Sequence, residues 1–270
     1  MDGGYAVPSF CVWNLEMMDA VLSVAQDMRA PVILMNGPCE FRLMGPELMA
    51  GAAEVAARRY MVPAALHLDH GESPERVRAC IDHGYTSVML DYSVRPFEEN
   101  VEALSDVVAL ARPLGITVEG EMGHVGRADI TSFEGEGESA LTMPEEAAEY
   151  VERTGVDALA VSIGNAHGRY AKLPQFDFPR LEAIRRAVPV PLVLHGGSGT
   201  PDEDIKRAVS LGMAKINVAT ELVTAMHDSL RRDMLGEHPS WLPHAHADSV
   251  RAMDPVIARW LTLTGAAGQA

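Results

Sequence analysis

Three histidines, His70, His167 and His195, each lie at the end of an apolar stretch and directly before a glycine. If those stretches are parallel strands, their ends are where an active site forms. A single histidine in such a position is more often a hydrogen-bonded structural residue than a ligand. Three imidazoles that converge and leave one coordination position open are typical of a catalytic zinc site. The sequence therefore predicts a divalent metal site at these residues.

Carboxylates occur beside or between these histidines. Asp69 directly precedes His70, and Asp91 and Glu121 end two further apolar stretches. Asp91 and Glu121 could bind the metal directly, hold a second or displaced ion, or orient a ligand through its other ring nitrogen. The plainer interpretation is a solvated carboxylate at the start of a loop. For His67 we expect a side chain that points elsewhere, in a structural or supporting role.

Two stretches of small residues predict an anion site. Each follows an apolar stretch and precedes a helix, where backbone N–H groups and the helix dipole favour a phosphate. An isolated Gly-Gly pair is more often only a tight turn, but the loops after the seventh and eighth strands are the usual phosphate position of a (β/α)8 barrel. The residues concerned are Gly196, Gly197, Ser198, Asn217, Val218, Ala219 and Thr220.

The elements that must position these residues follow a repeating pattern of a short apolar stretch and then an amphipathic one, which is typical of alternating strands and helices. Eight such units in 270 residues predict a single (β/α)8 TIM barrel. The expected strands are Tyr5–Val12, Pro31–Leu34, Ala64–Leu68, Ser87–Leu90, Thr117–Glu119, Ala158–Ile163, Pro191–Leu194 and Ala214–Val218.

The barrel domain is expected to span residues 1–235, with its last helix running from Glu221 to about Leu235. Residues 236–270 are expected to form a helical appendage that packs on the barrel or on a neighbouring subunit, with an amphipathic stretch at Ser249–Leu263. The long segment between Glu121 and Met143 has no clear periodicity and carries several glycines. Such a long loop is more often functional than idle.

Composition excludes several classes of protein. The formal net charge of −16 provides no broad positive field for a nucleic acid. No apolar run approaches the ~20 residues of a membrane span, and three well-separated cysteines indicate neither a disulfide framework nor a thiolate zinc site. We expect a cytoplasmic protein that binds neither nucleic acid nor membrane.

From about Tyr5 to Leu222 the sequence resembles the class II, zinc-dependent ketose-bisphosphate aldolases, which include the fructose- and tagatose-bisphosphate aldolases. Six motifs carry the resemblance in order along the chain. They are ALHLDHG at 65–71, SVMLD at 87–91, VEGEMG at 118–123, TGVDALAVSIGNAHG at 154–168, PLVLHGGSG at 191–199 and KINVATEL at 215–222.

The resemblance implies roles for individual residues. His70, His167 and His195 would be the zinc ligands, and Asp69 the acid that protonates the aldehyde oxygen. Asp91 and Glu121 match positions that hold metal in alternative states, with room for a second divalent or a monovalent cation. The triose phosphate would be held by Gly168, Gly196–Ser198 and Asn217–Thr220. A homodimer or homotetramer is also implied.

Three positions depart from the family pattern. Asp129 stands where a loop glutamate normally serves proton transfer at the triose carbon, so we assign that role to Asp129. Tyr92 replaces a usual glycine, and Cys11 replaces a frequent asparagine near the first strand. These changes near the rim are expected to alter the acceptor aldehyde.

The expected reaction is reversible cleavage of a ketose phosphate, first of all fructose or tagatose 1,6-bisphosphate, to dihydroxyacetone phosphate and an aldehyde, as in glycolysis. An inositol-catabolic ketose phosphate is an alternative substrate within the family. A metal-dependent hydrolase lacks its His-x-His pair here, and a non-catalytic sugar-phosphate-binding protein would have no use for Asp69. A Schiff-base mechanism would need Lys172, Lys206 or Lys215. A distal phosphate or acid group could bind Arg127, Arg251 or Arg259.

Overall fold

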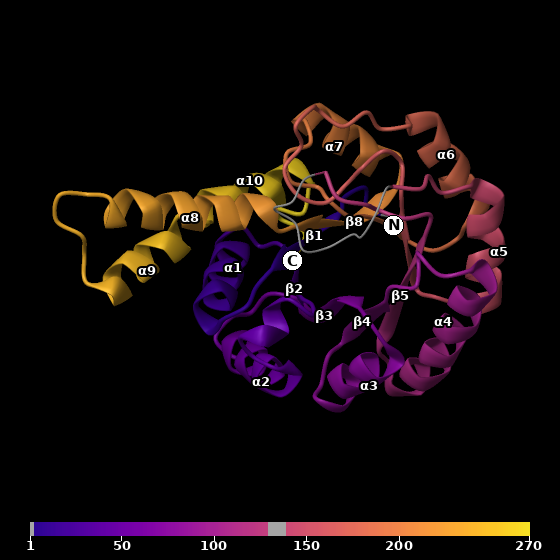
Figure 1. The fold of residues 1–270 in the computed structure, drawn as a ribbon, viewed down its shortest axis with the longest axis horizontal. Coiled ribbons are helices and arrows are strands. Elements are labelled where there is room, and N and C mark those ends of the chain that lie inside the picture. The colour runs from indigo at the N-terminus through magenta and orange to yellow at the C-terminus, as the bar shows by residue number, and fades with distance from the viewer. Residues whose placement is uncertain (1–2, 129–138) are drawn as a thin grey trace.

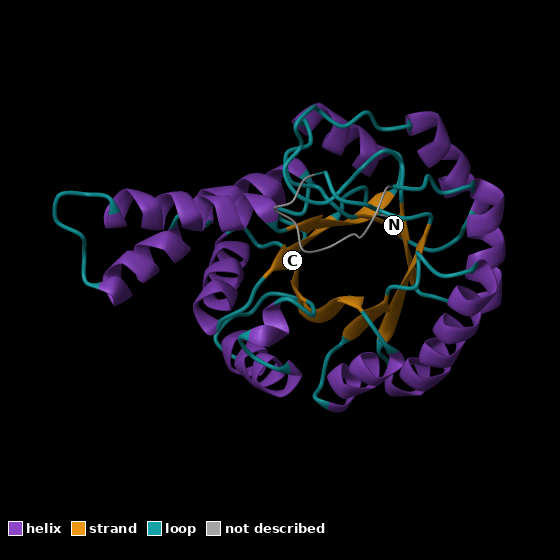
Figure 2. Ribbon diagram, viewed as in Figure 1, coloured by secondary structure: helices purple, strands orange, loops and turns teal. Residues whose placement is uncertain are grey.

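A computed structural model describes residues 3–128 and 139–270. Eight parallel strands pair in chain order and the last returns to the first, which closes a barrel surrounded by helices (Figures 1 and 2). The predicted TIM barrel is thereby confirmed. Its strands are β1 (Val7–Cys11), β2 (Val32–Asn36), β3 (Ala64–Gly71), β4 (Ser87–Leu90), β5 (Thr117–Met122), β6 (Ala158–Val161), β7 (Leu192–Leu194) and β8 (Met213–Val218).

Helices begin where local start signals occur. The side chain of Asn14 caps the first helix by accepting a hydrogen bond from the Met17 amide at 2.9 Å, and Ser73 caps the third in the same way. The helices of the barrel are α1 (Leu15–Asp27), α2 (Pro46–Ala57), α3 (Pro74–Asp82), α4 (Phe97–Ala111), α5 (Pro144–Thr154), α6 (Phe178–Ala187), α7 (Asp202–Ser210) and α8 (Thr220–Met234). Two short 3₁₀ helices, η1 (Glu40–Arg42) and η2 (Arg112–Leu114), complete the connections.

The apolar core fills the layer between the strands and the helices. Strand side chains alternate, so that Leu66 and Leu68 of β3 join this layer while His67 and Asp69 face the barrel interior. The interior also receives Glu119 from β5 and Lys215 from β8. The apolar layer therefore stabilises the fold, while polar side chains within the interior lead up to the rim.

Strand β3 departs from regular geometry at its end. His70 has φ +45°, in the left-handed region, and the pairing of β3 with β4 shifts register between Leu68 and Gly71. In a regular strand Asp69 and His70 would point to opposite faces. A bulge re-aims one side chain, so both residues can reach the same rim. Such a non-glycine conformation costs on the order of 1–3 kcal/mol, and strain of this kind is commonly retained at functional sites.

Two further helices follow the barrel, α9 (Leu242–Arg251) and α10 (Asp254–Leu263). The amphipathic stretch expected at Ser249–Leu263 contains the end of α9 and all of α10, and the chain breaks after Arg251 and restarts with Pro255 in the first turn of α10. Proline is tolerated in a first turn but not inside a helix. The outer half of α8 projects from the barrel together with α9, and the two form a hairpin (Figure 1). Helix α10 returns to the barrel and buries Trp260. None of the described helices is both long and apolar enough to cross a membrane.

Candidate active site

The three histidines from β3, β6 and β7 come together at the carboxyl end of the barrel. Their ring centroids are 4.9 Å apart for His70 and His167, 4.7 Å for His70 and His195, and 5.7 Å for His167 and His195. Each ring offers one nitrogen as a potential ligand, and these three nitrogens lie within 4.8 Å of one another. This spacing is compact enough for one metal ion to bind all three nitrogens.

Each ring is held through its remaining nitrogen. Nδ1 of His70 lies 2.7 Å from Oδ2 of Asp91, Nδ1 of His167 donates to the backbone oxygen of Val125 at 3.1 Å, and Nε2 of His195 donates to Oε1 of Glu119 at 2.9 Å. Metal-binding histidines characteristically donate their other N–H to a carboxylate or a carbonyl, which sets the tautomer and the ring orientation. All three rings follow this pattern.

Two buried atoms at the centre of the site support a metal ligand set. Nδ1 of His195 and Oε2 of Glu121 lie 3.3 Å apart, and neither makes a hydrogen bond within the described part of the chain. Buried polar atoms are rarely left in this state without a functional reason. An ion bound by the three imidazoles would satisfy both, so the donors fit a borderline-soft divalent metal such as zinc.

Protonation at the site differs from ring to ring. Burial, with the neighbouring His70 and His195 rings, holds the pKa of His167 well below its usual value. Burial also disfavours a charged His195, but the hydrogen bond to Glu119 outweighs it and raises the pKa of His195. Burial and the Asp91 charge raise the pKa of Glu121. His167 therefore stays neutral to a lower pH than His195, whose protonated form is favoured by its hydrogen bond to Glu119.

Asp91 and Glu121 take different positions around the triad. Asp91 contacts the outer nitrogen of His70 and accepts hydrogen bonds from the backbone and the hydroxyl of Ser93, at 3.0 and 2.7 Å. Glu121 accepts from the Val125 amide through Oε1 at 3.0 Å and keeps Oε2 beside His195. The geometry favours Asp91 as the residue that orients His70, and Glu121 as the carboxylate nearer to the ligand nitrogens.

Asp69 lies beside the triad and is anchored from across the barrel. Asn217 of β8 donates from Nδ2 to both carboxylate oxygens, at 3.0 and 3.2 Å. Burial opposes ionisation, but the nearby His70 and His67 outweigh it and hold the pKa of Asp69 well below its usual range. The group is therefore a carboxylate at neutral pH. It is available to accept a proton without being a member of the histidine cluster.

The expectation that His67 points elsewhere is wrong, because His67 and Asp69 are two residues apart on one strand and therefore share a face. Nε2 of His67 accepts a hydrogen bond from the Lys215 ammonium at 3.1 Å, and its Nδ1 lies 2.7 Å from the Ser87 hydroxyl. The same ammonium lies 2.7 Å from Oε2 of Glu119. His67 is thus part of a buried network beneath the histidine triad, in the supporting role that was expected.

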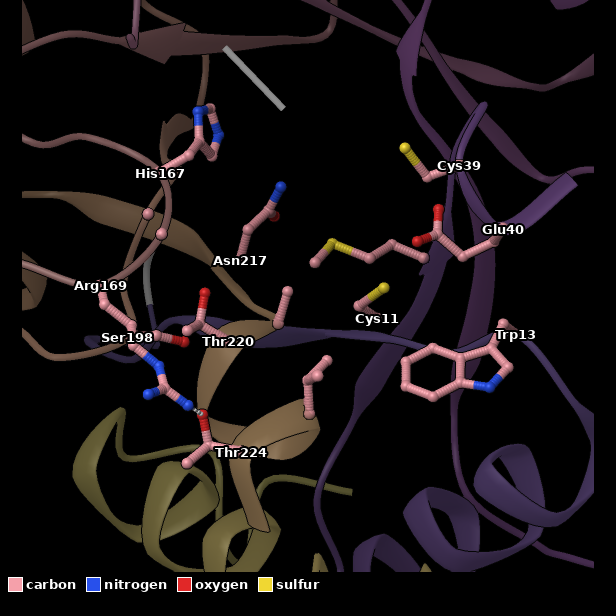
Figure 3. Close-up of a pocket in the computed structure, with 15 residues that line it drawn as sticks. Cys11, Trp13, Cys39, Glu40, His167, Arg169, Ser198, Asn217, Thr220 and Thr224 are labelled. Carbon is pink, nitrogen blue, oxygen red and sulfur yellow. Dashed lines mark hydrogen bonds between the residues drawn. The ribbon is translucent and has the colours of Figure 1, made fainter. Parts of the chain in front are cut away.

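A cavity of about 330 Å³ opens beside the triad, with two facing walls (Figure 3). Six of the eight residues expected to hold phosphate line one wall, namely Gly168, Gly196, Ser198, Asn217, Ala219 and Thr220. The other two do not line it, because the amide of Gly197 donates to the Asn217 carbonyl at 3.1 Å and the Val218 side chain packs in the apolar layer. Gly196 has φ +65°, and a Cβ there would lie 2.1 Å from the Ala166 oxygen, so only glycine fits.

Sequence reasoning missed part of this cavity. Arg169 and Thr224 extend the wall where phosphate was expected and are joined by a hydrogen bond of 3.0 Å. The opposite wall follows β1 and β2 and consists of Cys11, Trp13, Met35, Cys39 and Glu40. The rule that strand ends form the site would have found most of these residues, had it been applied to the first two strands as it was to the other six.

Among the described residues, the three candidate arginines do not line this cavity. Asp129 lies outside the described residues. Arg259 pairs with Asp202 and with Glu221 on the outside of the barrel, and neither Arg127 nor Arg251 is among the residues that line the cavity.

Comparison with known proteins agrees with this arrangement. Residues 1–269 match the family model described as fructose-bisphosphate aldolase class-II. The YdjI aldolase of Escherichia coli K12 is similar at 37% identity with a TM-score of 0.87, over 100% of this chain and 95% of that one. A proposed fructose-1,6-bisphosphate aldolase of Coccidioides immitis is similar at 30% identity with a TM-score of 0.88, over 99% and 94% of the two chains.

A further similar structure is the fructose-bisphosphate aldolase of Campylobacter jejuni, at 25% identity with a TM-score of 0.81, over 100% of this chain and 93% of that one. The agreement therefore extends along the whole barrel and both C-terminal helices. With a family model that covers nearly every residue, the chain belongs to the class II fructose-bisphosphate aldolase family, a family of aldehyde-lyases.

Proposed function

We propose that this protein is a zinc-dependent aldolase that reversibly cleaves a ketose phosphate to dihydroxyacetone phosphate and an aldehyde. The observation that carries the proposal is the histidine triad, in which every outer nitrogen is held by an acceptor, beside an ionised Asp69. His70, His167 and His195 would hold the zinc ion. When bound, that ion would supply Lewis-acid stabilisation of the negative charge that develops on the ketose oxygens.

Proton transfer at the C4 hydroxyl is the proposed task of Asp69. In the cleavage direction a base must accept this proton as the carbon–carbon bond breaks, and in the reverse direction the same group returns it to the aldehyde oxygen. The low pKa of Asp69 keeps it in the basic form, and the two hydrogen bonds from Asn217 hold its orientation. Asp69 would act in this way without binding the metal.

The phosphate of the triose half would bind the wall formed by β6, β7 and β8. The backbone turns at Gly168 and Gly196, the hydroxyls of Ser198 and Thr220, and the N-terminus of α8 supply donors there. With this arrangement the C1 phosphate anchors the substrate at one end. The carbonyl then lies toward the triad.

For the proton at the triose carbon we propose Asp129. Asp129→Ala should slow hydrogen exchange at that carbon of dihydroxyacetone phosphate while leaving the affinity for the phosphate largely intact. Deuterium exchange followed by NMR measures this. Unchanged exchange in Asp129→Ala, with a large loss in Glu134→Ala or Glu136→Ala, would transfer the role to a later carboxylate.

The rival mechanisms are tested by one assay. Lys215, which lies on strand β8 of the barrel, already binds Glu119 and His67, which disfavours a Schiff base. Purified zinc-loaded protein should release dihydroxyacetone phosphate from ketose phosphates, with fructose and tagatose 1,6-bisphosphate among the first candidates and an inositol-catabolic ketose phosphate as the alternative. Phosphate-ester hydrolysis instead would indicate a hydrolase, and binding without turnover a non-catalytic protein.

Three broader predictions accompany this function. We propose a barrel domain of residues 1–235 with an appendage of residues 236–270, assembly into a homodimer or homotetramer, and a cytoplasmic location. Sedimentation of the purified protein measures its oligomeric state.

A further inference from the structure

The two walls of the cavity differ in chemistry. The wall after β6, β7 and β8 carries glycine turns, hydroxyls and the Arg169 guanidinium. The facing wall, after β1 and β2, carries two thiols, a thioether, an indole and one carboxylate, that of Glu40 (Figure 3). Of the described residues that line the cavity, Arg169 is the only lysine or arginine, and it lies on the phosphate wall.

Glu40 is held firmly in its position. It is the first residue of η1, and its Oε2 accepts a hydrogen bond from the Gly37 amide at 2.8 Å. The Cys11 thiol is a second hydrogen-bonding partner. Burial raises the pKa of Glu40 and outweighs these hydrogen bonds. Charged or neutral, the side chain presents carboxyl oxygens and no positive charge to the cavity.

Asp69 lies between the two walls, because Asn217 of the phosphate wall donates to its carboxylate and the turn before Glu40 packs against its backbone. A Cβ on Gly37 would be 2.6 Å from the backbone oxygen of Asp69, so the turn that holds Glu40 rests directly on the residue assigned to the aldehyde oxygen. The C1 phosphate is assigned to the opposite wall. The carbons beyond the cleaved bond therefore extend toward Glu40, Cys11 and Trp13.

A second phosphate would bind poorly at the Glu40 wall. A phosphate binds where backbone amides, arginine or lysine converge, and none of the described residues on this wall offers a cationic side chain. A carboxylate close to a phosphate repels it. The same carboxylate is a good acceptor for a hydroxyl, and the indole and thioether suit an uncharged carbon chain.

We propose that the acceptor half of the substrate is an uncharged, hydroxyl-bearing aldehyde selected by Glu40, so that the ketose is a 1-monophosphate. This inference rests on the proposed aldolase function. It assigns Glu40 as a specificity-determining residue that accepts a hydrogen bond from a hydroxyl of the aldehyde.

The test is aldol addition of dihydroxyacetone phosphate to three aldehydes, with kcat/KM measured for each. D-Glyceraldehyde is neutral, D-glyceraldehyde 3-phosphate carries a phosphate, and tartronate semialdehyde carries a carboxylate. We expect kcat/KM for D-glyceraldehyde to exceed the values for both anionic aldehydes by at least about tenfold, in line with the loss expected when a charged group meets a site that cannot pair it.

Glu40→Gln should narrow this preference by about tenfold, because it replaces a carboxyl group that can carry negative charge with a neutral amide of the same shape. Glu47→Gln is the matched control, since it removes one charge from an exposed position on α2 and should leave the preference unchanged. Thermal melting of each variant checks that it is folded. If Glu40→Gln does not fold, the ratio among the three aldehydes in the wild-type protein still decides the substrate class.

The outcomes separate the two proposals. A preference for D-glyceraldehyde 3-phosphate in the wild-type protein would overturn the monophosphate inference and leave the aldolase function standing. A preference for the neutral aldehyde that Glu40→Gln does not change would overturn the assignment to Glu40. No addition product with any of the three aldehydes would contradict the aldolase function itself.

Discussion

Two clusters of potential ligand side chains lie one above the other in this barrel, and they differ in what surrounds their ligand atoms. The upper cluster consists of His70, His167 and His195 at the rim. The lower cluster consists of His67, Asp69 and Glu119, which are also close enough together to ligate an ion. In the lower cluster the Lys215 ammonium lies 2.7 Å from Glu119 and 3.1 Å from His67.

The difference shows that ligand-type residues alone do not make a metal site. Lysine offers only donors, so its ammonium supplies the positive charge and the hydrogen bonds that an ion would otherwise supply in the lower cluster. In the upper cluster the outer ring nitrogens are held by acceptors, namely Asp91, the Val125 carbonyl and Glu119. A hydrogen bond between His195 of the upper cluster and Glu119 of the lower cluster joins the two. Through this bond the lower network holds the His195 ring in place.

The most severe test of the comparison removes a ligand from the upper cluster. His195→Ala should lose zinc and reduce turnover to the limit of detection, because two imidazoles hold a structural or catalytic zinc poorly. His67→Ala, the matched change in the lower cluster, should retain the ion. Elemental analysis and turnover, before and after chelation and zinc addition, measure both. Full activity in metal-free wild-type protein would contradict the proposed mechanism.

The second test concerns Asp69, which belongs to the lower cluster and lies beside the histidine triad. Asp69→Ala should lower turnover by about 10²–10⁴-fold, the usual loss for a general acid or base, while zinc content stays near that of the wild type. The reason is that Asp69 binds Asn217 and lies outside the histidine triad. Loss of zinc in this variant would show that Asp69 is a ligand.

The third test removes the cation from the lower cluster. Lys215→Met should reduce the free energy of unfolding by about 3–5 kcal/mol, the usual cost of leaving a buried charge without its partner. Adding Glu119→Gln should recover part of this loss. Denaturant unfolding of the metal-free proteins measures it. A stability equal to that of the wild type in Lys215→Met would mean that the ammonium is not what neutralises Glu119.

The smallest expected effect is on the pH dependence of zinc binding. Because the Glu119 hydrogen bond outweighs burial and raises the pKa of His195, His195 must release a proton to bind zinc below that pKa. Affinity should therefore weaken as pH falls through it, by about tenfold per pH unit for one proton, and should be flat above it. Calorimetry in buffers of different ionisation enthalpy counts the proton, and Glu119→Gln should move the onset to lower pH.

Much of the candidate site was accessible from sequence because it follows from strand ends. The eight apolar stretches indicated a barrel, and in a barrel the carboxyl ends of all strands meet at one rim. His70, His167 and His195 could therefore be placed together although about a hundred residues separate the first from the others. The break between α9 and α10 could not be placed, because an amphipathic pattern continues across it.

Other features depend on contacts between distant strands. The orientation of His67 was misjudged, since its face is set by the register of β3 and its partners are on β4, β5 and β8. Glu40 was not predicted as a site residue. The Asp69 backbone, which packs against its turn, and the Cys11 thiol, which hydrogen-bonds to it, are both far from it in sequence.

The sequence by itself determined the barrel, the three histidines at its rim and the glycine turns beside them, because strand and helix periodicity and glycine turns are local properties of the chain. Only the tertiary structure decided that Asp69 and His70 share the rim, since the bulge of β3 arises from its pairing with β4. It also decided which histidine cluster has a lysine at its centre. Lys215 reaches the lower cluster because β8 lies across the barrel from β3 and β5. No local pattern of residues encodes which strands face each other in this way.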